Sequence, residues 1–149
     1  MIWTPHTTVA SIIERSGRFL MVEELDRDGK TVFNQPAGHL EEAESLLDAV
    51  IRETREETGW GFVPQALVGI YRWQVPPAET TYLRFCFHGR CHDHQPELPL
   101  DDGILRAVWL NRDELAANPH QLRSPMVLRC IDDYLSGCRY PLELINDLK

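Results

Sequence analysis

Apolar and β-branched clusters near the N-terminus predict three short strands, over residues 7–14, 18–25 and 31–36. Ser16-Gly17 separates the first two and favours a hairpin turn, and the polar stretch 26–30 (DRDGK) predicts a loop before the third. We expect the third strand to end at Pro36, because proline lacks the N–H that a sheet ladder needs.

A helix is predicted between Ser45 and Gly59. Ser45 begins an S-x-x-D capping box with Asp48, and Gly59 is typical of the residue that ends a helix. The first turns of this segment carry an apolar stripe that can pack against a sheet, formed by Leu46, Leu47, Val50 and Ile51.

The remaining chain shows both strand and helix patterns. We expect strands over 65–75 and 81–91 joined by 76–80, a polar loop over 92–103, a strand over 104–110, a short capped helix over 111–118 and an amphipathic helix over 124–137. This order predicts an α/β fold, in which helices cover both faces of a mixed sheet.

Within the strand 81–91, successive side chains should point to opposite faces of the sheet. Leu83, Phe85 and Phe87 are expected to face a core, while the residues between them, including Tyr82 and Arg84, face the other side. Arg84 is therefore a candidate for contact with a ligand.

Composition and charge limit the class of protein. With 149 residues, 43% of them hydrophobic, the chain is long enough for one domain over residues 1–149. The formal net charge of −8 argues against duplex nucleic acid as a partner, since such binding depends on lysine and arginine. A bound divalent cation can nevertheless bring a phosphorylated small molecule to an acidic site.

Neither a signal peptide nor a membrane span is expected, because Glu14, Arg15 and Arg18 interrupt the apolar runs near the N-terminus. The four cysteines form no C-x-x-C pair and are interpreted as reduced thiols, most of them packing groups. Together these features predict a cytoplasmic protein.

The predicted helix carries an unusual concentration of acidic residues. Glu53, Glu56 and Glu57 share one helical face, since residues three and four apart are neighbours there. Like charges repel at this spacing, and the helix dipole also disfavours anions near the C-terminus. A solvated surface with Arg52 and Arg55 relieving the repulsion is one interpretation; a site for a hard divalent cation, which prefers oxygen ligands, is the other.

The residues around this helix resemble the Nudix box, G-x5-E-x7-R-E-U-x-E-E-x-G-U, in which U is apolar. All seven fixed positions agree: Gly38, Glu44, Arg52, Glu53, Glu56, Glu57 and Gly59. Thr54, which is only partly apolar, and Trp60, which is bulkier than usual, depart from the pattern at the two apolar positions. The chain is thus similar to the Nudix hydrolase family, and the departures concern packing rather than the carboxylates.

That resemblance implies an α/β/α sandwich around a mixed sheet and hydrolysis of a nucleoside diphosphate linked to another moiety, with Mg²⁺ or Mn²⁺ as the cofactor. It implies that Glu53, Glu56 and Glu57 bind the metal together with the Gly38 carbonyl. One of these glutamates, or an acidic residue of the later loop, would take a proton from water. Arg52 would orient a catalytic carboxylate, and Glu44 and Gly59 would be structural.

Further stretches resemble one group of bacterial phosphatases in that family: FNQPAGHLE (33–41), LRF (83–85), LRSP (122–125) and SGCRYPLE (136–143). This likeness implies nucleoside tri- and diphosphates as substrates, together with the hydroxymethylpyrimidine diphosphate of thiamine synthesis. The expected partner is a small phosphorylated metabolite or nucleotide, bound by a monomer or a homodimer.

Several roles stay open at this point. Asn34, Arg84, Tyr82 and His39 are candidates for substrate contact, although Arg84 can equally be a half-buried strand residue and Asn34 and His39 can be turn residues. Glu97, Asp101 and Asp102 compete for an additional place in the metal site. The ligand-rich stretch 91–97 (CHDHQPE) is expected to be a hydrated loop rather than a zinc site, since a second ligand pair is missing.

Two alternatives to the leading function also remain. One is a non-enzymatic sensor of a nucleotide-like metabolite on the same fold, and the other is a hydrolase of nucleotide sugars or dinucleoside polyphosphates. The complete set of box carboxylates favours an enzyme over a sensor, because binding alone needs fewer metal ligands.

Overall fold

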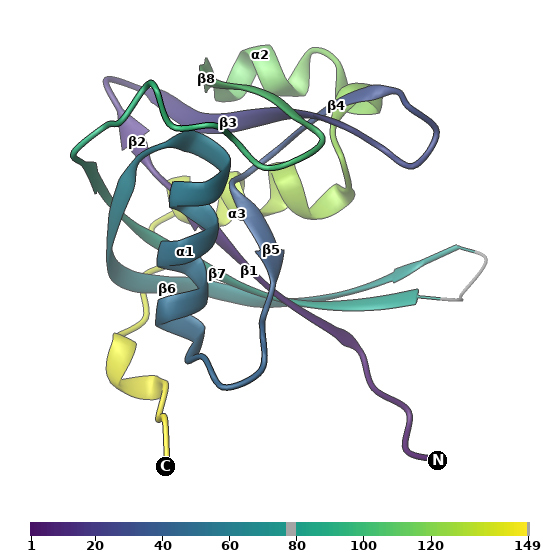
Figure 1. Cartoon of the computed structure of the whole chain (residues 1–149), viewed down its shortest axis with the longest axis vertical. Helices are drawn as coiled ribbons and strands as arrows, with labels where there is room; N and C mark the ends of the chain where they lie inside the picture. Colours follow the sequence, from purple (N-terminus) through teal and green to yellow (C-terminus); the bar gives the residue numbers. More distant parts are fainter. Residues whose placement is uncertain (77–79, 149) are drawn as a thin grey trace.

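The centre of the molecule is a four-stranded mixed sheet, which the computed structural model shows together with a second sheet and helices on either side (Figure 1). The structure describes residues 1–76 and 80–148. The mixed sheet has the order β5 (Ala37–His39), β1 (His6–Ile12), β7 (Thr80–His92), β6 (Gly61–Val75). Strands β1 and β7 run parallel, and the other neighbours are antiparallel.

The second sheet is antiparallel and is built around β3 (Arg18–Leu25). Strand β8 (Ile104–Asn111) pairs with β3 along one edge, while β2 (Glu14–Arg15) and β4 (Thr31–Asn34) follow each other along the opposite edge. The predicted α/β fold with a mixed sheet is confirmed, and the second sheet is an addition to it.

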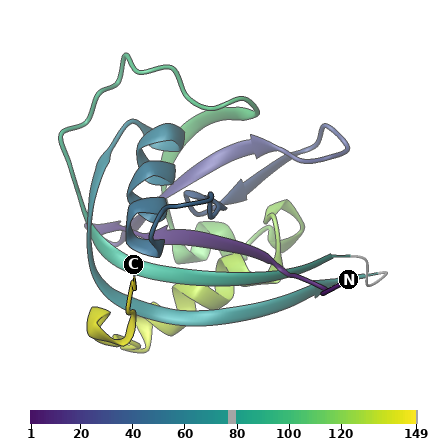
Figure 2. The ribbon, with the colours of Figure 1, turned by 60° about the horizontal axis from the view of Figure 1, so that its bottom comes forward.

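Helices cover both faces of this arrangement (Figures 1 and 2). Helix α1 (Leu46–Thr58) packs on one face, with Val50 in a buried cluster that includes Val9 and Phe87. Helices α2 (Arg112–Ala116) and α3 (Pro125–Leu135) pack on the other, where Ile131 joins a cluster with Ala10. Short 3-10 helices occupy Pro119–Gln121 and Leu142–Leu144.

Pro36 marks the point where the chain leaves one sheet for the other. Strand β4 ends at Asn34, and the carbonyl of Pro36 accepts a hydrogen bond of 3.0 Å from the backbone N–H of Ser11. A second short strand, β5, then pairs with β1. The sequence pattern predicted the end of β4 within two residues but missed β5. Strand β5 brings Gly38 to the edge of the mixed sheet.

The ends of α1 agree with the sequence prediction. The Ser45 hydroxyl accepts from the backbone N–H of Asp48, and Gly59 ends the helix in the left-handed conformation with φ of 76°. Thr54, at an apolar position of the box, is fully buried and donates to the Val50 carbonyl at 2.7 Å, with Ser11 Oγ 3.0 Å away. Its polar group is therefore satisfied inside the core.

Strand β7 alternates as predicted and is buried on both faces, because α1 covers one face of the mixed sheet and α3 covers the other. Phe87 packs in the cluster under α1, and Cys86 packs in the cluster under α3. Arg84, two residues before Cys86, is buried as well.

The C-terminal half differs from expectation mainly at strand ends. Strand β6 starts at Gly61 rather than at residue 65, with irregular register at Pro64/Ala66 and Leu67/Gly69. Part of the predicted connection 76–80, residues 77–79, lies outside the described residues. The predicted apolar face of α3 is buried as expected, and all four cysteines are free.

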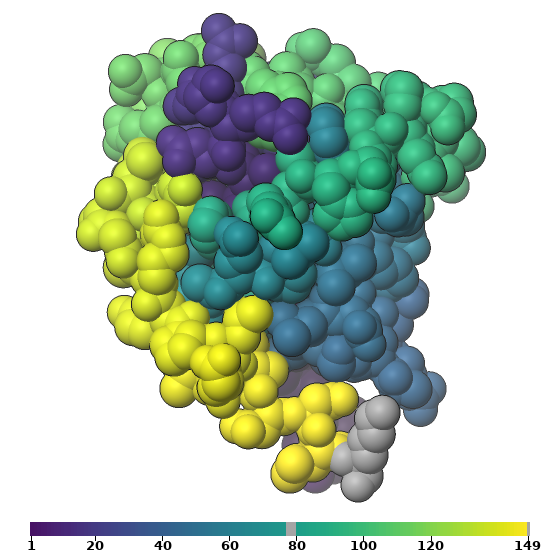
Figure 3. Space-filling view, turned by 90° about the vertical axis from the view of Figure 1, so that its left-hand side faces the viewer, coloured from purple at the N-terminus to yellow at the C-terminus, as the bar shows by residue number. Residues whose placement is uncertain are grey.

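The segment after α3 returns to the edge strand β6, where Leu67 and Tyr140 exchange two backbone hydrogen bonds of 2.8 Å. Figure 3 shows this C-terminal segment in yellow on the face of the molecule that also displays β6 in teal. Within residues 1–76 and 80–148, no helix is long and apolar enough to cross a membrane.

Replacing Gly59 by alanine should destabilise the fold more than the same change at Gly137. Both glycines have positive φ, which costs an alanine about 1–2 kcal/mol. A Cβ at Gly59 would also lie 2.8 Å from the Gln95 carbonyl oxygen, whereas nothing lies within 4 Å at Gly137. Urea unfolding should therefore show a larger loss of unfolding free energy for Gly59→Ala, and equal losses would mean that the Gln95 segment yields without cost.

Candidate active site

Strand β5 passes directly beside the side chain of Glu53. A Cβ added at Gly38 would overlap the carboxylate of Glu53, so any larger residue would displace that carboxylate. Glycine is needed here for close approach rather than for its backbone angles. The contact places the Gly38 backbone beside the acidic face of α1.

Three carboxylates converge at this point. Glu53, Glu56 and Asp101 each offer an oxygen, and the three oxygens lie within 4.8 Å of one another. The loop that carries Asp101 is held by a 3.0 Å hydrogen bond from the Asp101 backbone N–H to the Glu56 carbonyl. Of the three acidic loop residues left open by the sequence, Asp101 joins this group, whereas Glu97 and Asp102 do not.

Glu57 occupies a different position from the other two box glutamates. Its side chain is buried, and Oε1 accepts a 2.9 Å hydrogen bond from the backbone N–H of Ala37. Burial raises the pKa of Glu57 to about 9, with the charges of Glu24, Glu53 and Asp101 adding to the effect and the Ala37 N–H opposing it. Its role as a metal ligand stays a prediction.

The pKa of Glu53 is also raised, though less than that of Glu57. Burial raises its pKa to about 6, against the opposing hydrogen bond and charge of Arg52. Raised pKa values in neighbouring carboxylates mean that bringing these groups together without a cation is unfavourable for their charged forms. A divalent ion would reverse that preference.

Arg52 links the acidic residues. Its Nε and Nη2 donate to the two oxygens of Glu44 at 3.0 and 2.7 Å, and Nη1 donates to Glu53 at 2.7 Å and to Glu56 at 3.2 Å. Nη2 also donates to the His39 carbonyl at 3.1 Å. The hydrogen bonds to Glu44 raise the pKa of Arg52, and Arg52 lowers the pKa of Glu44. Arg52 thus connects the box entrance to two carboxylates of the convergent group, with Glu44 as its bidentate partner.

The donor set suits a hard cation. Carboxylate oxygens, with a backbone carbonyl nearby, are the ligands that Mg²⁺ and Mn²⁺ prefer. Among residues 1–76 and 80–148, Glu53, Glu56 and Asp101 form the one group of three or more such side chains close enough to share an ion. The metal roles of Gly38, Glu53 and Glu56 remain predictions that this geometry accommodates.

The loop 91–97 has other contacts. The His92 ring and the Asp93 carboxylate form a 2.8 Å hydrogen bond, and the His94 ring stacks on Trp60 with 4.3 Å between centroids. The bulky Trp60 of the box therefore packs against this loop. Cys91 and His92 belong to β7 rather than to a loop, and the interpretation of the remaining residues as a hydrated loop stays a prediction.

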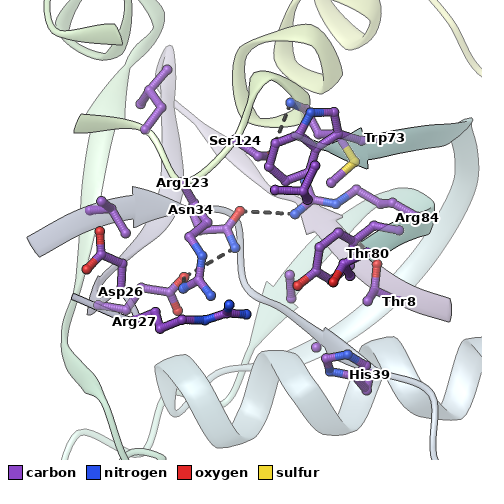
Figure 4. A pocket seen from close by; sticks show the side chains of 18 of the residues that line it. Thr8, Asp26, Arg27, Asn34, His39, Trp73, Thr80, Arg84, Arg123 and Ser124 are labelled. Atoms are coloured by element: carbon purple, nitrogen blue, oxygen red, sulfur yellow. Dashed lines mark hydrogen bonds and ion pairs between the residues drawn. The ribbon is translucent and has the colours of Figure 1, made fainter. Parts of the chain in front are cut away.

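A pocket of ≈ 640 Å³ extends from the acidic group into the space between the two sheets. Gly38, Glu53 and Glu57 line one part of it. All four residues predicted to contact substrate line it as well: Asn34, Arg84, Tyr82 and His39. Figure 4 shows Arg84 directed toward Asn34, with His39 placed apart from them beside a helix.

Asn34 and Gln35 hold Arg84 rather than only closing a turn. Arg84 is 3% exposed, and it donates to Asn34 Oδ1 at 3.1 Å and to Gln35 Oε1 at 2.8 Å. Gln35 in turn donates to the Val127 carbonyl of α3 at 2.7 Å. Arg84 is therefore fully buried rather than half-buried, and its contact with a substrate stays a prediction.

His39 lies at the edge of the pocket and has a histidine partner. Its Nε2 is 3.1 Å from His6 Nδ1, so one ring donates to the other. Burial, followed by the neighbouring His6, lowers the pKa of His39. The position is compatible with phosphate contact, and that role stays a prediction.

The lining residues that the sequence analysis missed include Glu24, Trp73 and Arg123. Glu24 accepts from Arg123 at 2.9 Å and from Asn34 at 3.3 Å, and Trp73 stacks with Tyr82 with 5.9 Å between centroids. The stretch LRSP contains Arg123 and was the one available signal. Glu24 and Trp73 belong to ordinary strand patterns, which indicate no function.

Comparison with known proteins agrees with this geometry. The NUDIX domain family is matched over residues 4–129, and the chain belongs to that family. It is 42% identical over 146 residues to the phosphatase NudJ of Escherichia coli K12, covering 98% of this chain and 94% of NudJ. The resemblance to a bacterial phosphatase group is thereby confirmed, and that group is NudJ.

Similar solved structures are also NUDIX hydrolases. A NUDIX hydrolase from Nitrosomonas europaea is 46% identical, with a TM-score of 0.95 over 97% of this chain and 98% of that one. A MutT NUDIX hydrolase from Burkholderia pseudomallei shares the fold alone, at 17% identity and a TM-score of 0.71 over 88% and 98% of the two chains. The protein is a hydrolase with pyrophosphatase or phosphatase activity on nucleotide-like substrates, from a family that generally uses divalent metal ions.

Replacing Asp101 by asparagine should weaken divalent-metal binding, while Asp102→Asn should not. A metal that binds only the folded protein raises its melting temperature, so titration with Mg²⁺ or Mn²⁺ gives the affinity. Asp101 belongs to the convergent group and its exposed neighbour Asp102 does not. Loss of even a supporting group costs roughly 10–100-fold in metal affinity, and a wild-type response from Asp101→Asn would exclude Asp101 from the site.

Proposed function

We propose that this protein hydrolyses a pyrophosphate bond in a nucleoside tri- or diphosphate, or in a related small diphosphate, with Mg²⁺ or Mn²⁺ as the cofactor. The observation that carries the proposal is the convergence of Glu53, Glu56 and Asp101 within 4.8 Å beside a pocket of ≈ 640 Å³. A volume of this size is typical of small-molecule sites.

Glu53, Glu56 and the Gly38 carbonyl would hold the cation, with Asp101 and Glu57 as the adjacent carboxylates. When bound, the ion supplies positive charge that neutralises the diphosphate oxygens and lets water attack phosphorus. Arg52 keeps Glu53 and Glu56 in place through its hydrogen bonds to both. A rigid carboxylate arrangement is what this chemistry needs, because positioning and electrostatics carry most phosphoryl-transfer catalysis.

A carboxylate of the same group would take the proton of the attacking water. Glu57 has one oxygen held by the Ala37 N–H and lines the pocket, so its second oxygen can face the substrate. Because burial raises the pKa of Glu57 to about 9, this role requires a bound cation that favours its charged form. Asp101 is the acidic loop residue that can assist. Asn34, Arg84, Tyr82 and His39 would bind the rest of the substrate across the pocket.

The similarity to the phosphatase NudJ supports a phosphorylated substrate. The substrates that the sequence resemblance implies are nucleoside tri- and diphosphates and the hydroxymethylpyrimidine diphosphate of thiamine synthesis. Nucleotide sugars and dinucleoside polyphosphates are the alternative substrates within the same reaction class. We place the enzyme in the cytoplasm, where these metabolites occur, as a monomer or a homodimer.

The Glu57→Gln variant should lose most of its activity. Cleavage would be measured with Mg²⁺ by separating the products of nucleoside tri- and diphosphates, a pyrimidine-methyl diphosphate, a sugar nucleotide and a dinucleoside polyphosphate. Product separation is needed because the last two are cleaved into two phosphorylated products without release of inorganic phosphate. Loss of a general acid-base group typically lowers the rate about 10²–10⁴-fold. Glu97→Gln, an exposed change in the later loop, serves as the matched control and should retain wild-type rates.

Equal rates for Glu57→Gln and wild type would refute the role of Glu57. Tight binding of a panel member by the wild-type protein without cleavage of any member would instead indicate the non-enzymatic sensor.

A further inference from the structure

Arg84 is a buried cation that forms no ion pair with a carboxylate in the described part of the chain. Its polar partners are the amide oxygens of Asn34 and Gln35, together with Cys130 Sγ at 3.9 Å. Buried charges are normally paired, because removal from water is costly. An arginine held in this way has capacity for a further partner.

The unused donors can be identified. A guanidinium has five N–H groups. Nη1 donates to Gln35 Oε1 and to Cys130 Sγ, and Nη2 donates one hydrogen bond, to Asn34 Oδ1. Nε is buried without a partner among the described residues, and one N–H of Nη2 is also unused. These are the two nitrogens through which Arg52 binds both oxygens of Glu44, so Arg84 retains a donor pair of the same kind.

The sheet register places Arg84 away from the acidic group. Thr8 of β1 pairs with His39 of β5 on one side and with Arg84 of β7 on the other. Two strand spacings separate the backbones of His39 and Arg84 by about 10 Å. A diphosphate beside Gly38 and Glu53 would therefore leave the organic part of the substrate, rather than a phosphate, near Arg84.

Trp73 and Tyr82 form an aromatic wall of the pocket and stack with an interplanar angle of 18°. Tyr82 lies on the same strand as Arg84, and its ring centroid is 6.4 Å from that of His39. Figure 4 shows Trp73 beside the Arg84 side chain. An indole face is a favourable surface for a flat heteroaromatic ring.

We propose that Arg84 determines substrate specificity by donating to adjacent acceptors on the substrate ring, as on the O6/N7 edge of guanine. The proposal rests on the function proposed above and names the part of the substrate that this residue recognises. Arginine matches the guanine edge with two donors, whereas adenine presents an amino donor beside N7. Because Nε is sealed from water, its contact with the ring requires the side chains around Arg84 to shift on binding.

Arg84→Lys tests the proposal, since lysine keeps the charge and removes the paired donors. The measurements are kcat/KM for GTP and ATP with Mg²⁺, and the inhibition constant of inorganic tripolyphosphate, which has no ring. We expect the wild type to have a higher kcat/KM for GTP than for ATP. In the variant, kcat/KM for GTP should fall roughly tenfold, while kcat/KM for ATP and the inhibition constant of tripolyphosphate should change little. Arg90→Lys, an exposed change on the same strand, is the matched control and should behave as wild type.

Other results overturn the proposal. If kcat/KM for GTP and ATP and the affinity for tripolyphosphate all fell equally, Arg84 would be assigned to phosphate binding or to structure. A wild-type enzyme without preference for GTP would exclude selection of the ring. Failure of the wild type to release phosphate from any nucleotide would instead contradict the proposed function itself.

If Arg84→Lys lacks a cooperative thermal transition, Trp73→Leu provides the second test. It changes a half-buried side chain at the aromatic wall. It should raise KM for both nucleotides and leave tripolyphosphate inhibition unchanged. Weaker inhibition by tripolyphosphate to the same extent would refute ring binding at this end of the pocket.

Discussion

The contact between Gly38 and the carboxylate of Glu53 is the constraint on which the rest of the site depends. Because Gly38 has no side chain, the carboxylate of Glu53 can lie directly against the backbone of the edge strand β5. That approach brings the Ala37 N–H to Glu57 and the His39 carbonyl to Arg52. Three consecutive residues of a short strand therefore fix the orientation of the acidic helix face relative to the mixed sheet.

The same arrangement explains how so many acidic groups are tolerated. The guanidinium of Arg52 donates hydrogen bonds to Glu44, Glu53 and Glu56, and its positive charge offsets part of their repulsion. Glu57 receives only a backbone N–H, and burial favours its protonated form. Both acidic and basic side chains line the pocket, with Glu53 and Glu57 beside β5 and Arg84 buried in β7.

Local signals in the sequence predicted the elements that depend on local interactions. The helix from Ser45 to Gly59 has both of its end signals, and the shared face of its glutamates follows from helical spacing alone. Strand β5 was missed, because a three-residue strand has no measurable periodicity. Asp101 could not be selected over Glu97 or Asp102, since its place depends on a backbone bond to Glu56. Contacts such as Arg123 with Glu24, 99 residues apart, exist only in the folded chain.

The loop that carries Asp101 is attached to the end of α1 at two points. The Gln95 N–H donates to the Gly59 carbonyl at 2.9 Å, and the Asp101 N–H donates to the Glu56 carbonyl at 3.0 Å. The number of residues between these anchors sets where the aspartate falls relative to the helix. Insertions or deletions in that interval would move an acidic group of the site without altering the box, so loop length is a route by which such enzymes can diverge while their signature stays intact.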